Sequence, residues 1–287
     1  MFKIYYSLTK PGIIYGNLIT VAAGFILGTK SHLDIPLLAE TLIGISLVIA
    51  SGCVLNNIID RDIDALMERT RGRALVKGLV PVVHAYVFAL VLGSLGSWTL
   101  GYFTNALALS TALFGLFAYV FIYSLWSKRN SVHGTLLGSI SGAIPPVVGY
   151  VAVTGNFDLG AAILFLILTL WQMPHSYGVA MYRLLDYANA HIPVLPVKKG
   201  SQATKRHILV YVVLFTLSLF SLYFFNYAGR VFLSIMMPLA LWWLILALRS
   251  FSLKDDKRFG RIIFLHSIII IVFFAVALVL DHYFFIR

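Results

Sequence analysis

The sequence is poor in charge and in cysteine. Of its 287 residues only 11% are charged and 60% are hydrophobic, and the mean hydropathy is +0.90, whereas soluble domains carry roughly a quarter charged residues. This composition excludes an ordinary soluble fold. The single cysteine, Cys53, excludes an internal disulfide and a cysteine-based metal cluster. We interpret it as a small apolar residue within a helix.

Long apolar runs take the place of charge. Runs of about 20 residues, the length that a helix needs to cross a bilayer core, recur between polar, Gly or Pro residues, and the first lacks a signal-peptide cleavage site. The sequence therefore predicts an all-α polytopic membrane protein, a single domain over residues 1–287. Nine transmembrane helices are expected in one bundle, around a central cavity open toward the cytoplasm. Their predicted ranges are 12–29, 37–58, 81–102, 106–126, 135–153, 159–182, 207–227, 231–248 and 262–285.

Basic residues gather on one side of these predicted spans. Of the 22 Lys and Arg residues, 19 precede the first span or follow an even-numbered one. The other 3 are Lys30, Arg230 and Arg287. Because short cytoplasmic segments collect Lys and Arg, the N-terminus is predicted to be cytoplasmic and the C-terminus outside. This asymmetry and anionic lipid headgroups explain the net charge of +11, so no nucleic-acid partner is expected.

One polar segment interrupts the apolar pattern at the end of the second predicted span. It reads NNIIDRDIDALMERTRGRALVKG and covers residues 56–78. Asn56, Asp60 and Asp64 are spaced by four and share one helix face, whereas Asp62 lies about 200° away around the helix. Two carboxylates and an amide oxygen on one face indicate an all-oxygen site that suits Mg²⁺, with substrate phosphates as its further ligands.

Basic residues follow the acids at the same interval. Arg69, Arg73 and Lys77 are spaced by four, although a glycine between them disfavours one unbroken helix. Guanidinium groups bind phosphate oxygens bidentately, so the segment predicts a metal–diphosphate site. A solvated loop whose acids balance topogenic bases is the alternative, and the depth of the carboxylates in the membrane favours function. The predicted catalytic residues are Asp60, Asp64, Arg69 and Arg73.

The order of these residues resembles the first acidic motif of the UbiA-type intramembrane prenyltransferases. The matching residues are Asn56, Asp60, Asp64, Met67, Arg69, Thr70 and Arg73. Many members of that family have Asp directly after the first Asn, where this chain has Asn57, so the resemblance implies a site with one negative charge fewer. The metal ligands that the resemblance implies are Asn56, Asp60, Asp64 and, after the sixth span, Asp186.

Four further segments resemble the haem O synthase branch of that family. They are TKPGIIYGN at 9–17, YSLWSKRNSVHGTLLGSISGAIPPVVGY at 123–150, WQMPHSYGVAMYRLLDY at 171–187 and IPVLPV at 192–197. The resemblance implies transfer of farnesyl from farnesyl diphosphate to a vinyl group of haem b, with addition of water and with Mg²⁺ as cofactor. It also implies a bacterial inner membrane and its lipid as surroundings. A haem-copper terminal oxidase or a haem-delivery protein would be a further partner.

The fifth predicted span carries glycines at a regular spacing. Gly134, Gly138 and Gly142 form a ridge of small residues that lets helices approach closely. Pro145 and Pro146 follow and are expected to break this span near its middle.

The short loop before the fifth span is basic. Lys128 and Arg129 are placed to reach the same diphosphate as Arg69 and Arg73, or they serve only as a topology signal. Lys77 is a weaker candidate for that diphosphate. His133 receives no role.

Polar residues share one face at the end of the sixth predicted span. The residues of this face are Gln172, His175, Val179, Tyr182 and Asp186. Given the resemblance, His175 is expected in the haem pocket as an axial ligand or as a partner of a propionate. Gln172, Tyr182 and Arg183 are the other expected haem-binding residues. Asp186 would hold a second Mg²⁺ or pair with Arg183.

Other functions fit part of the pattern. A prenyltransferase for a quinone precursor or a chlorophyll-type acceptor is the nearest alternative, but the Trp-Gln-x-Pro-His segment and the missing second acidic cluster favour haem. A secondary transporter would show paired repeats and charge deep in its spans, and the sequence has no convincing repeat. An inactive assembly factor is a third alternative.

Overall fold

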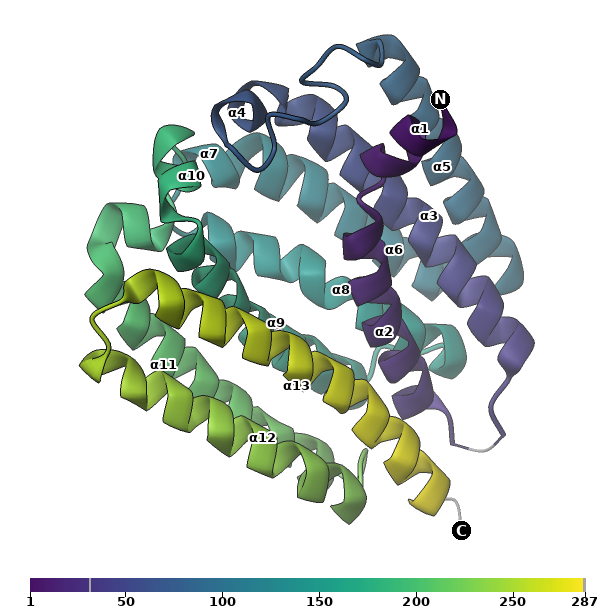
Figure 1. Ribbon diagram of the computed structural model, residues 1–287. Helices are drawn as coiled ribbons and strands as arrows, with labels where there is room; N and C mark the ends of the chain where they lie inside the picture. Colours follow the sequence, from purple (N-terminus) through teal and green to yellow (C-terminus); the bar gives the residue numbers. More distant parts are fainter. Residues whose placement is uncertain (31, 286–287) are drawn as a thin grey trace.

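The chain folds into a bundle of long helices (Figure 1). The computed structural model describes residues 1–30 and 32–285, so Arg287 lies outside the described residues. In chain order the elements are α1 (Phe2–Leu8), α2 (Pro11–Gly28), α3 (Ile35–Ile59), α4 (Arg61–Leu66), α5 (Val82–Phe103), α6 (Ala106–Phe117), the π-helix η1 (Ala118–Ser127), α7 (Lys128–Asn130), α8 (Gly134–Thr154), α9 (Leu159–Tyr182), α10 (Leu184–Asn189), α11 (Leu195–Phe224), α12 (Arg230–Arg249), the 3₁₀ helix η2 (Ser250–Ser252) and α13 (Asp256–Phe285).

The nine predicted spans are confirmed within the described part of the chain. Nine helices there are long and apolar enough to cross a membrane. The seventh begins at Leu195 rather than at 207, because a short helical segment with two exposed lysines continues into α11 through Gly200, whose φ is 77°. The ninth helix begins at Asp256 rather than at 262. Lys205, inside the extended α11, is buried and pairs with Asp256 at 2.7 Å, which offsets the cost of its burial.

Side chains cap the helices that begin at one end of the bundle. Asp34 accepts a hydrogen bond from the backbone N–H of Leu37 at the start of α3. Asn105 and Asp158 cap α6 and α9 in the same way. These residues satisfy N–H groups that have no partner within the helix. They therefore define where the spans begin.

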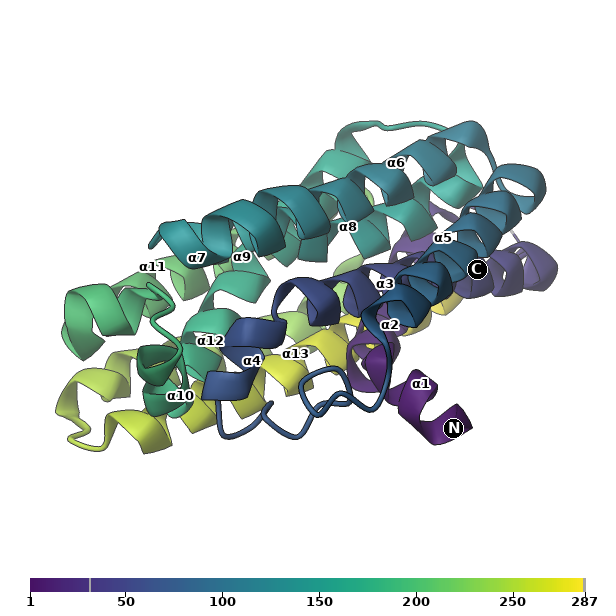
Figure 2. The ribbon, with the colours of Figure 1, turned by 90° about the horizontal axis from the view of Figure 1, so that it is seen from above.

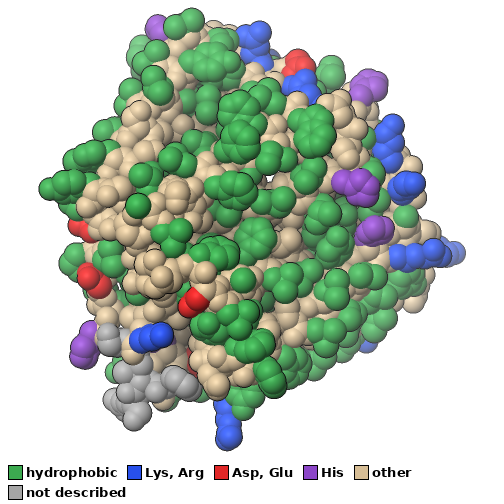
Figure 3. Space-filling view, turned by 180° about the vertical axis from the view of Figure 1, so that it is seen from behind, with side chains coloured by type: hydrophobic (Ala, Val, Ile, Leu, Met, Phe, Trp, Pro, Cys, Tyr) green, Lys and Arg blue, Asp and Glu red, His purple; other side chains and the backbone are tan. Residues whose placement is uncertain are grey.

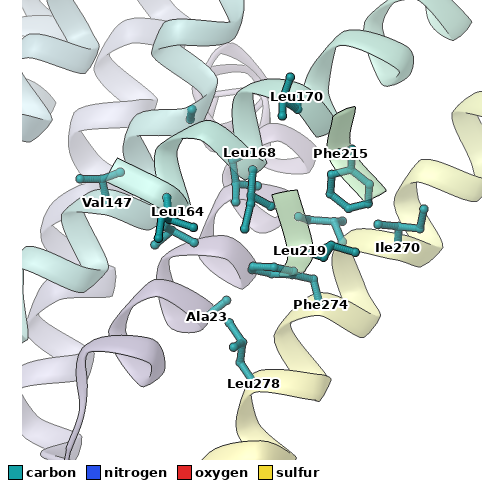
Figure 4. Packing of buried hydrophobic residues seen from close by; sticks show 14 of the residues in the cluster. Ala23, Val147, Leu164, Leu168, Leu170, Phe215, Leu219, Ile270, Phe274 and Leu278 are labelled. Atoms are coloured by element: carbon teal, nitrogen blue, oxygen red, sulfur yellow. The ribbon is translucent and has the colours of Figure 1, made fainter. Parts of the chain in front are cut away.

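Four helices enclose the centre of the molecule. α2 packs against α8, α8 against α9, α9 against α13, and α13 against α2. Buried side chains of α8, α9, α11 and α13 fill the space beside this ring (Figure 4). Figure 3 shows the exterior of the molecule from behind the view of Figure 1. Apolar side chains cover the middle of this face, and Lys and Arg lie mostly along its upper and right margins.

The fifth span is one unbroken helix, so the expected break at Pro145 and Pro146 is wrong. α8 contains both prolines in its interior. The contact with α2 is very close there, because a Cβ added to Gly24 would lie 1.9 Å from the backbone oxygen of Pro146. In lipid, such contacts between small residues supply much of the attraction between helices.

Replacing Gly24 by Ala is expected to destabilise the bundle. The added methyl group would meet backbone atoms of α8, so the two helices must separate, at a cost of about 1–3 kcal/mol. The measurement is the thermal unfolding midpoint of purified protein in detergent. Gly16→Ala is the matched control in the same helix, because nothing lies within 4 Å of its added Cβ. Equal unfolding midpoints for the two variants would contradict the prediction.

Candidate active site

The acidic residues lie where α3 passes into α4. The backbone N–H of Asp60 donates to the backbone oxygen of Asn56 at 2.9 Å, and the backbone N–H of Asp64 donates to the backbone oxygen of Asp60 at 2.8 Å. The helical spacing therefore continues through the junction. Asn56, Asp60 and Asp64 therefore share a face, as the sequence predicts. Their exposed fractions are 3%, 1% and 2%. Burial of two carboxylates requires cations or hydrogen-bond donors close by.

Basic side chains from three separate segments supply those partners. Lys128 donates to Asp60 Oδ2 at 2.5 Å, and Arg73 forms an ion pair with Asp64. Lys10 donates to Asn56 Oδ1. These residues and Asn56 are called the charged cluster below.

Lys10 was not predicted from its position before the first span. Its backbone has a left-handed conformation with φ of 53°, which precedes Pro11 at the start of α2. Burial, together with the nearby charge of Arg73, lowers the pKa of Lys10 from 10.5 to about 8. A lysine in a position of this kind is suited to binding a charged ligand. The signal in the sequence was its place in TKPGIIYGN, one of the segments that carry the resemblance.

Arg129 contacts Asp62, the acid that lies away from the face of Asp60 and Asp64. Its guanidinium donates to both carboxylate oxygens of Asp62 at 2.7 Å and lies 3.9 Å from Asp60 Oδ1. These hydrogen bonds hold the pKa of Asp62 at about 2. Arg129 is thus engaged on the outer side of α4, whereas Lys128 is directed into the cluster.

The segment after α4 consists of turns rather than a helix. Arg69 lines the central cavity, Arg73 reaches Asp64, and Lys77 is exposed and belongs to neither. Thr70 Oγ1 donates to the backbone oxygen of Asp64 at 2.9 Å, which fixes the segment to α4.

Met67 anchors this segment to the region of α10. Its side chain is buried with Ile63, Ala190 and Ile192. The motif residues Met67 and Thr70 therefore have a structural task, because they hold Arg69 and Arg73 in position beside the carboxylates. Ile192 comes from IPVLPV, so two segments of the resemblance meet here.

Asp186 connects the same two regions. α4 and α10 lie side by side at one end of the bundle (Figures 1 and 2), and Asp186 Oδ1 accepts the backbone N–H of Glu68 at 3.0 Å. The guanidinium of Arg183 lies over the ring of Tyr182 instead, 4.6 Å from its centre. Among residues 1–30 and 32–285, no group of three or more His, Cys, Asp or Glu side chains could hold a metal ion. The structure therefore does not bring Asp186 together with Asp60 and Asp64 in one ligand set.

The charged cluster fits a divalent cation that receives further ligands from a substrate. Asp60 Oδ1 is buried and has no hydrogen-bond partner among the described residues. An oxygen of this kind, beside Asp64 and the amide oxygen of Asn56, is the type of donor that Mg²⁺ prefers. Asn57 is directed elsewhere, since its Nδ2 donates to the backbone oxygen of Leu8 at 2.8 Å.

A cavity of about 810 Å³ begins at Lys128, the member of the charged cluster that lines it, and extends into the bundle. Arg69, Lys128 and Arg183 line it at the end near the cluster, and Leu168 and Ile271 line it farther along α9 and α13. The lining is mostly apolar. An elongated ligand with a charged head and an apolar body fits this distribution.

A π-helical segment forms one wall of the cavity next to the cluster. Within η1, Tyr119 and Tyr123 stack with ring centres 6.0 Å apart, and both line the cavity. Ser124 accepts from Asn56 Nδ2 at 2.9 Å and donates to the backbone oxygen of Tyr119 at 2.8 Å. π-helical turns occur frequently at functional sites. Sequence patterns predict an α-helix here, so these three residues were not predicted.

His175 is held rigidly in the wall of the same cavity. Its Nδ1 lies 2.7 Å from Ser267 Oγ, its ring stacks on Trp171, and Trp171 Nε1 donates to the backbone oxygen of Ser267 at 2.9 Å. The expected haem residues Gln172, His175, Tyr182 and Arg183 all line the cavity. Ser267, from α13, was not predicted, because it has no motif in the sequence.

The fold and the site together define a multi-pass membrane protein in which buried carboxylates and bases lie at one end of an apolar cavity. The sequence model of the UbiA prenyltransferase family matches residues 17–269, so the chain belongs to that family. It is therefore a prenyltransferase.

Similar proteins extend over almost the whole chain. Over 281 residues it is 51% identical to proteins named protoheme IX farnesyltransferase from Klebsiella pneumoniae subsp. pneumoniae and Salmonella arizonae, which covers 98% of this chain and 95% of each relative. A structure described for digeranylgeranylglyceryl phosphate synthase has a TM-score of 0.80 at 20% identity, over 98% of both chains. A UbiA homologue from Archaeoglobus fulgidus bound to GPP and Mg²⁺ has a TM-score of 0.69 at 16% identity, over 96% of this chain and 99% of that one. These structures show the shared fold.

Proposed function

We propose that the protein transfers the farnesyl group of farnesyl diphosphate to a vinyl group of haem b, with addition of water, giving haem O and diphosphate. The observation that carries the proposal is the charged cluster at one end of an apolar cavity of about 810 Å³. The names of the relatives that are 51% identical support farnesyl and haem as the two substrates. In this proposal residues 1–287 form a single catalytic domain.

The charged cluster would bind the diphosphate. Lys128 and Arg69 line the cavity and carry positive charge toward the place of the leaving group. Lys10 and Arg73 add positive charge through their contacts with Asn56 and Asp64. Positive charge fixed before the reaction stabilises the diphosphate as its bond to carbon breaks. Bound at Asn56, Asp60 and Asp64, Mg²⁺ would supply additional positive charge for the same leaving group.

The apolar remainder of the cavity would protect the reactive carbon. An allylic cation reacts rapidly with water, so it must meet the vinyl group in a space from which bulk water is excluded. Leu168, Ile271 and Val272 line that space. Arg183, stacked on Tyr182 near the charged end, is suited to hold a haem propionate.

The orientation in the membrane is part of the proposal. The charged cluster, α4 and α10 would face the cytoplasm of a bacterial cell, and the end of α13 would lie outside. The margin of Lys and Arg in Figure 3 and the 19 basic residues on that side support this orientation. The haem product would pass to a haem-copper terminal oxidase or a haem-delivery protein.

Mass spectrometry of extracted haems tests the function directly. Cells that express the protein are expected to contain haem O, and cells that lack it only haem b. Purified protein with farnesyl diphosphate, haem b and Mg²⁺ should give the same product. An aromatic quinone precursor and a chlorophyll-type acceptor are supplied in parallel reactions. Prenylation of either acceptor in place of haem would contradict the proposal.

A further inference from the structure

Three hydrogen-bond acceptors lie in the wall of the cavity, away from the charged cluster. They are the side chains of Gln172 and His175 and the backbone carbonyl of Gly142, here called the acceptor cluster. His175 is roughly 12 Å along α9 from Arg183, in a region where the cavity lining is otherwise mostly apolar. Polar groups in such surroundings are costly unless something binds to them.

Gln172 has an acceptor with no partner. Its Oε1 is buried and has no hydrogen bond to any described residue, although Gln172 lines the cavity. The amide lies against α8 at Gly142, where an added Cβ would be only 2.1 Å from Oε1. Gly142, predicted to serve helix packing, therefore leaves room for this amide.

The carbonyl of Gly142 lacks its usual donors. In a helix this oxygen accepts from the N–H three or four residues later. At those positions stand Pro145 and Pro146, which have no N–H. Gly142 also lines the cavity, so the proline pair leaves a second acceptor beside Gln172.

The contacts of His175 favour the tautomer in which the other ring nitrogen, Nε2, is unprotonated. Ser267 Oγ donates its one proton to the backbone oxygen of Phe264 at 2.6 Å. With that proton on the Phe264 oxygen, Ser267 Oγ accepts from the ring at 2.7 Å, which assigns the ring proton to Nδ1 of His175. Neutral histidine then has a lone pair at Nε2, able to accept a proton.

We propose that the acceptor cluster holds the water molecule that adds to the farnesylated haem, an inference that rests on the proposed function. A water that donates both O–H groups to the cluster presents its oxygen lone pair to the cavity. When the C–O bond of farnesyl diphosphate breaks, its electron pair leaves with the diphosphate. The vinyl π electrons form the new C–C bond, and the adjacent carbon becomes cationic. The water oxygen bonds to that carbon, and its proton passes to His175 Nε2.

Replacing Gln172 by Leu tests this assignment through the identity of the product. Without a positioned water, the cation loses a proton and gives an alkene that is lighter than haem O by one water. The ratio of hydrated to dehydrated product is expected to fall about tenfold, the effect of losing one positioned hydrogen bond. The measurement is liquid chromatography with mass spectrometry, using purified protein in nanodiscs with farnesyl diphosphate, haem b and Mg²⁺. Reactions in H₂¹⁸O verify that the hydroxyl oxygen comes from water.

Two further variants test whether the product ratio depends on the Gln172 amide itself. Gly142→Ala is expected to shift the ratio in the same direction, because the methyl group displaces the Gln172 amide. Asn17→Leu is the control for the ratio, since Asn17 lines the same cavity but its Nδ2 already donates to Ile13. An unchanged ratio in Gln172→Leu, with haem O still formed, would overturn the water site and leave the proposed function intact. A wild-type protein that makes no farnesylated haem would overturn the proposed function itself.

An optical titration tests the role of His175. If Nε2 receives a proton, His175→Ala should lower the product ratio and leave the absorption spectrum of bound ferric haem unchanged. A spectrum that changes from that of the wild type would identify His175 as an axial ligand of the iron and overturn its assignment as proton acceptor.

Discussion

Asp60→Asn is expected to lower the rate of farnesyl transfer by a factor on the order of 10²–10³ or more. The amide keeps the size of the side chain and removes the negative charge on which Lys128 and Asn56 converge. It also replaces one carboxylate oxygen by an amide nitrogen. Because Oδ2 accepts from Lys128 and Asn56, the nitrogen is expected in the place of Oδ1, the buried oxygen that has no partner among the described residues and is best suited to a divalent cation. The rate of haem O formation by purified protein, followed by mass spectrometry, measures the effect.

Asp62→Asn is the matched control for this variant. Asp62 lies two residues away in α4, is exposed, and pairs with Arg129 on the outer side of the helix. Exposed ion pairs contribute little to stability, so this variant should keep a rate within a few-fold of the wild type. Thermal unfolding of both variants shows whether the fold is intact. Equal losses of rate in the two, with both folded, would refute the assignment of the catalytic face.

Lys128→Met is expected to lower kcat/KM for farnesyl diphosphate by a factor on the order of 10². Lys128 is the basic residue that both lines the cavity and donates to Asp60, so its loss weakens the grip on the leaving group and leaves a buried carboxylate with one cation fewer. Lys128→Arg keeps the charge and should recover part of the activity. Initial rates over a range of farnesyl diphosphate concentrations measure the effect.

Lys77→Met provides the comparison. The sequence places Lys77 in the same four-residue series as Arg69 and Arg73, but the structure shows it exposed and outside the cavity lining. Its replacement should change kcat/KM by less than about twofold, as is usual for exposed residues without specific contacts. A loss for Lys77→Met as large as that for Lys128→Met would mean that the sequence spacing, and not the observed geometry, identifies the diphosphate site.

Much of the fold could be predicted because each span is a long apolar run with polar ends. Asn56, Asp60 and Asp64 could also be placed on one face, because residues that are four apart in a helix lie on the same side of it. The first residues of α11 and α13 could not be predicted, because charged residues such as Lys205 and Asp256 are typical of loops, and their ion pair is seen only in the structure.

The contacts between distant segments could not be predicted. Lys10, just before α2, and Ser124, in η1, reach Asn56 from other parts of the chain. A local sequence pattern does not indicate which helices are neighbours. The π-helical form of η1 is also set by packing rather than by composition. The two prolines of α8 suggested a break, but the surrounding helices hold the span together and leave only the carbonyls without donors.

The close fit of α2 on α8 has a consequence for biogenesis. The backbone of Pro146 fills the space beside Gly24, here called the notch of α2. However, α2 ends at residue 28 and α8 begins at residue 134, which is 106 residues later. At ordinary rates of synthesis this interval is roughly 5 to 20 s. During that time α2 resides in the bilayer without the helix that fills its notch. The ring closes only when α13 arrives, so the translocon and the surrounding lipid must accommodate α2 without at least one of its two ring neighbours, α8 and α13, for most of translation.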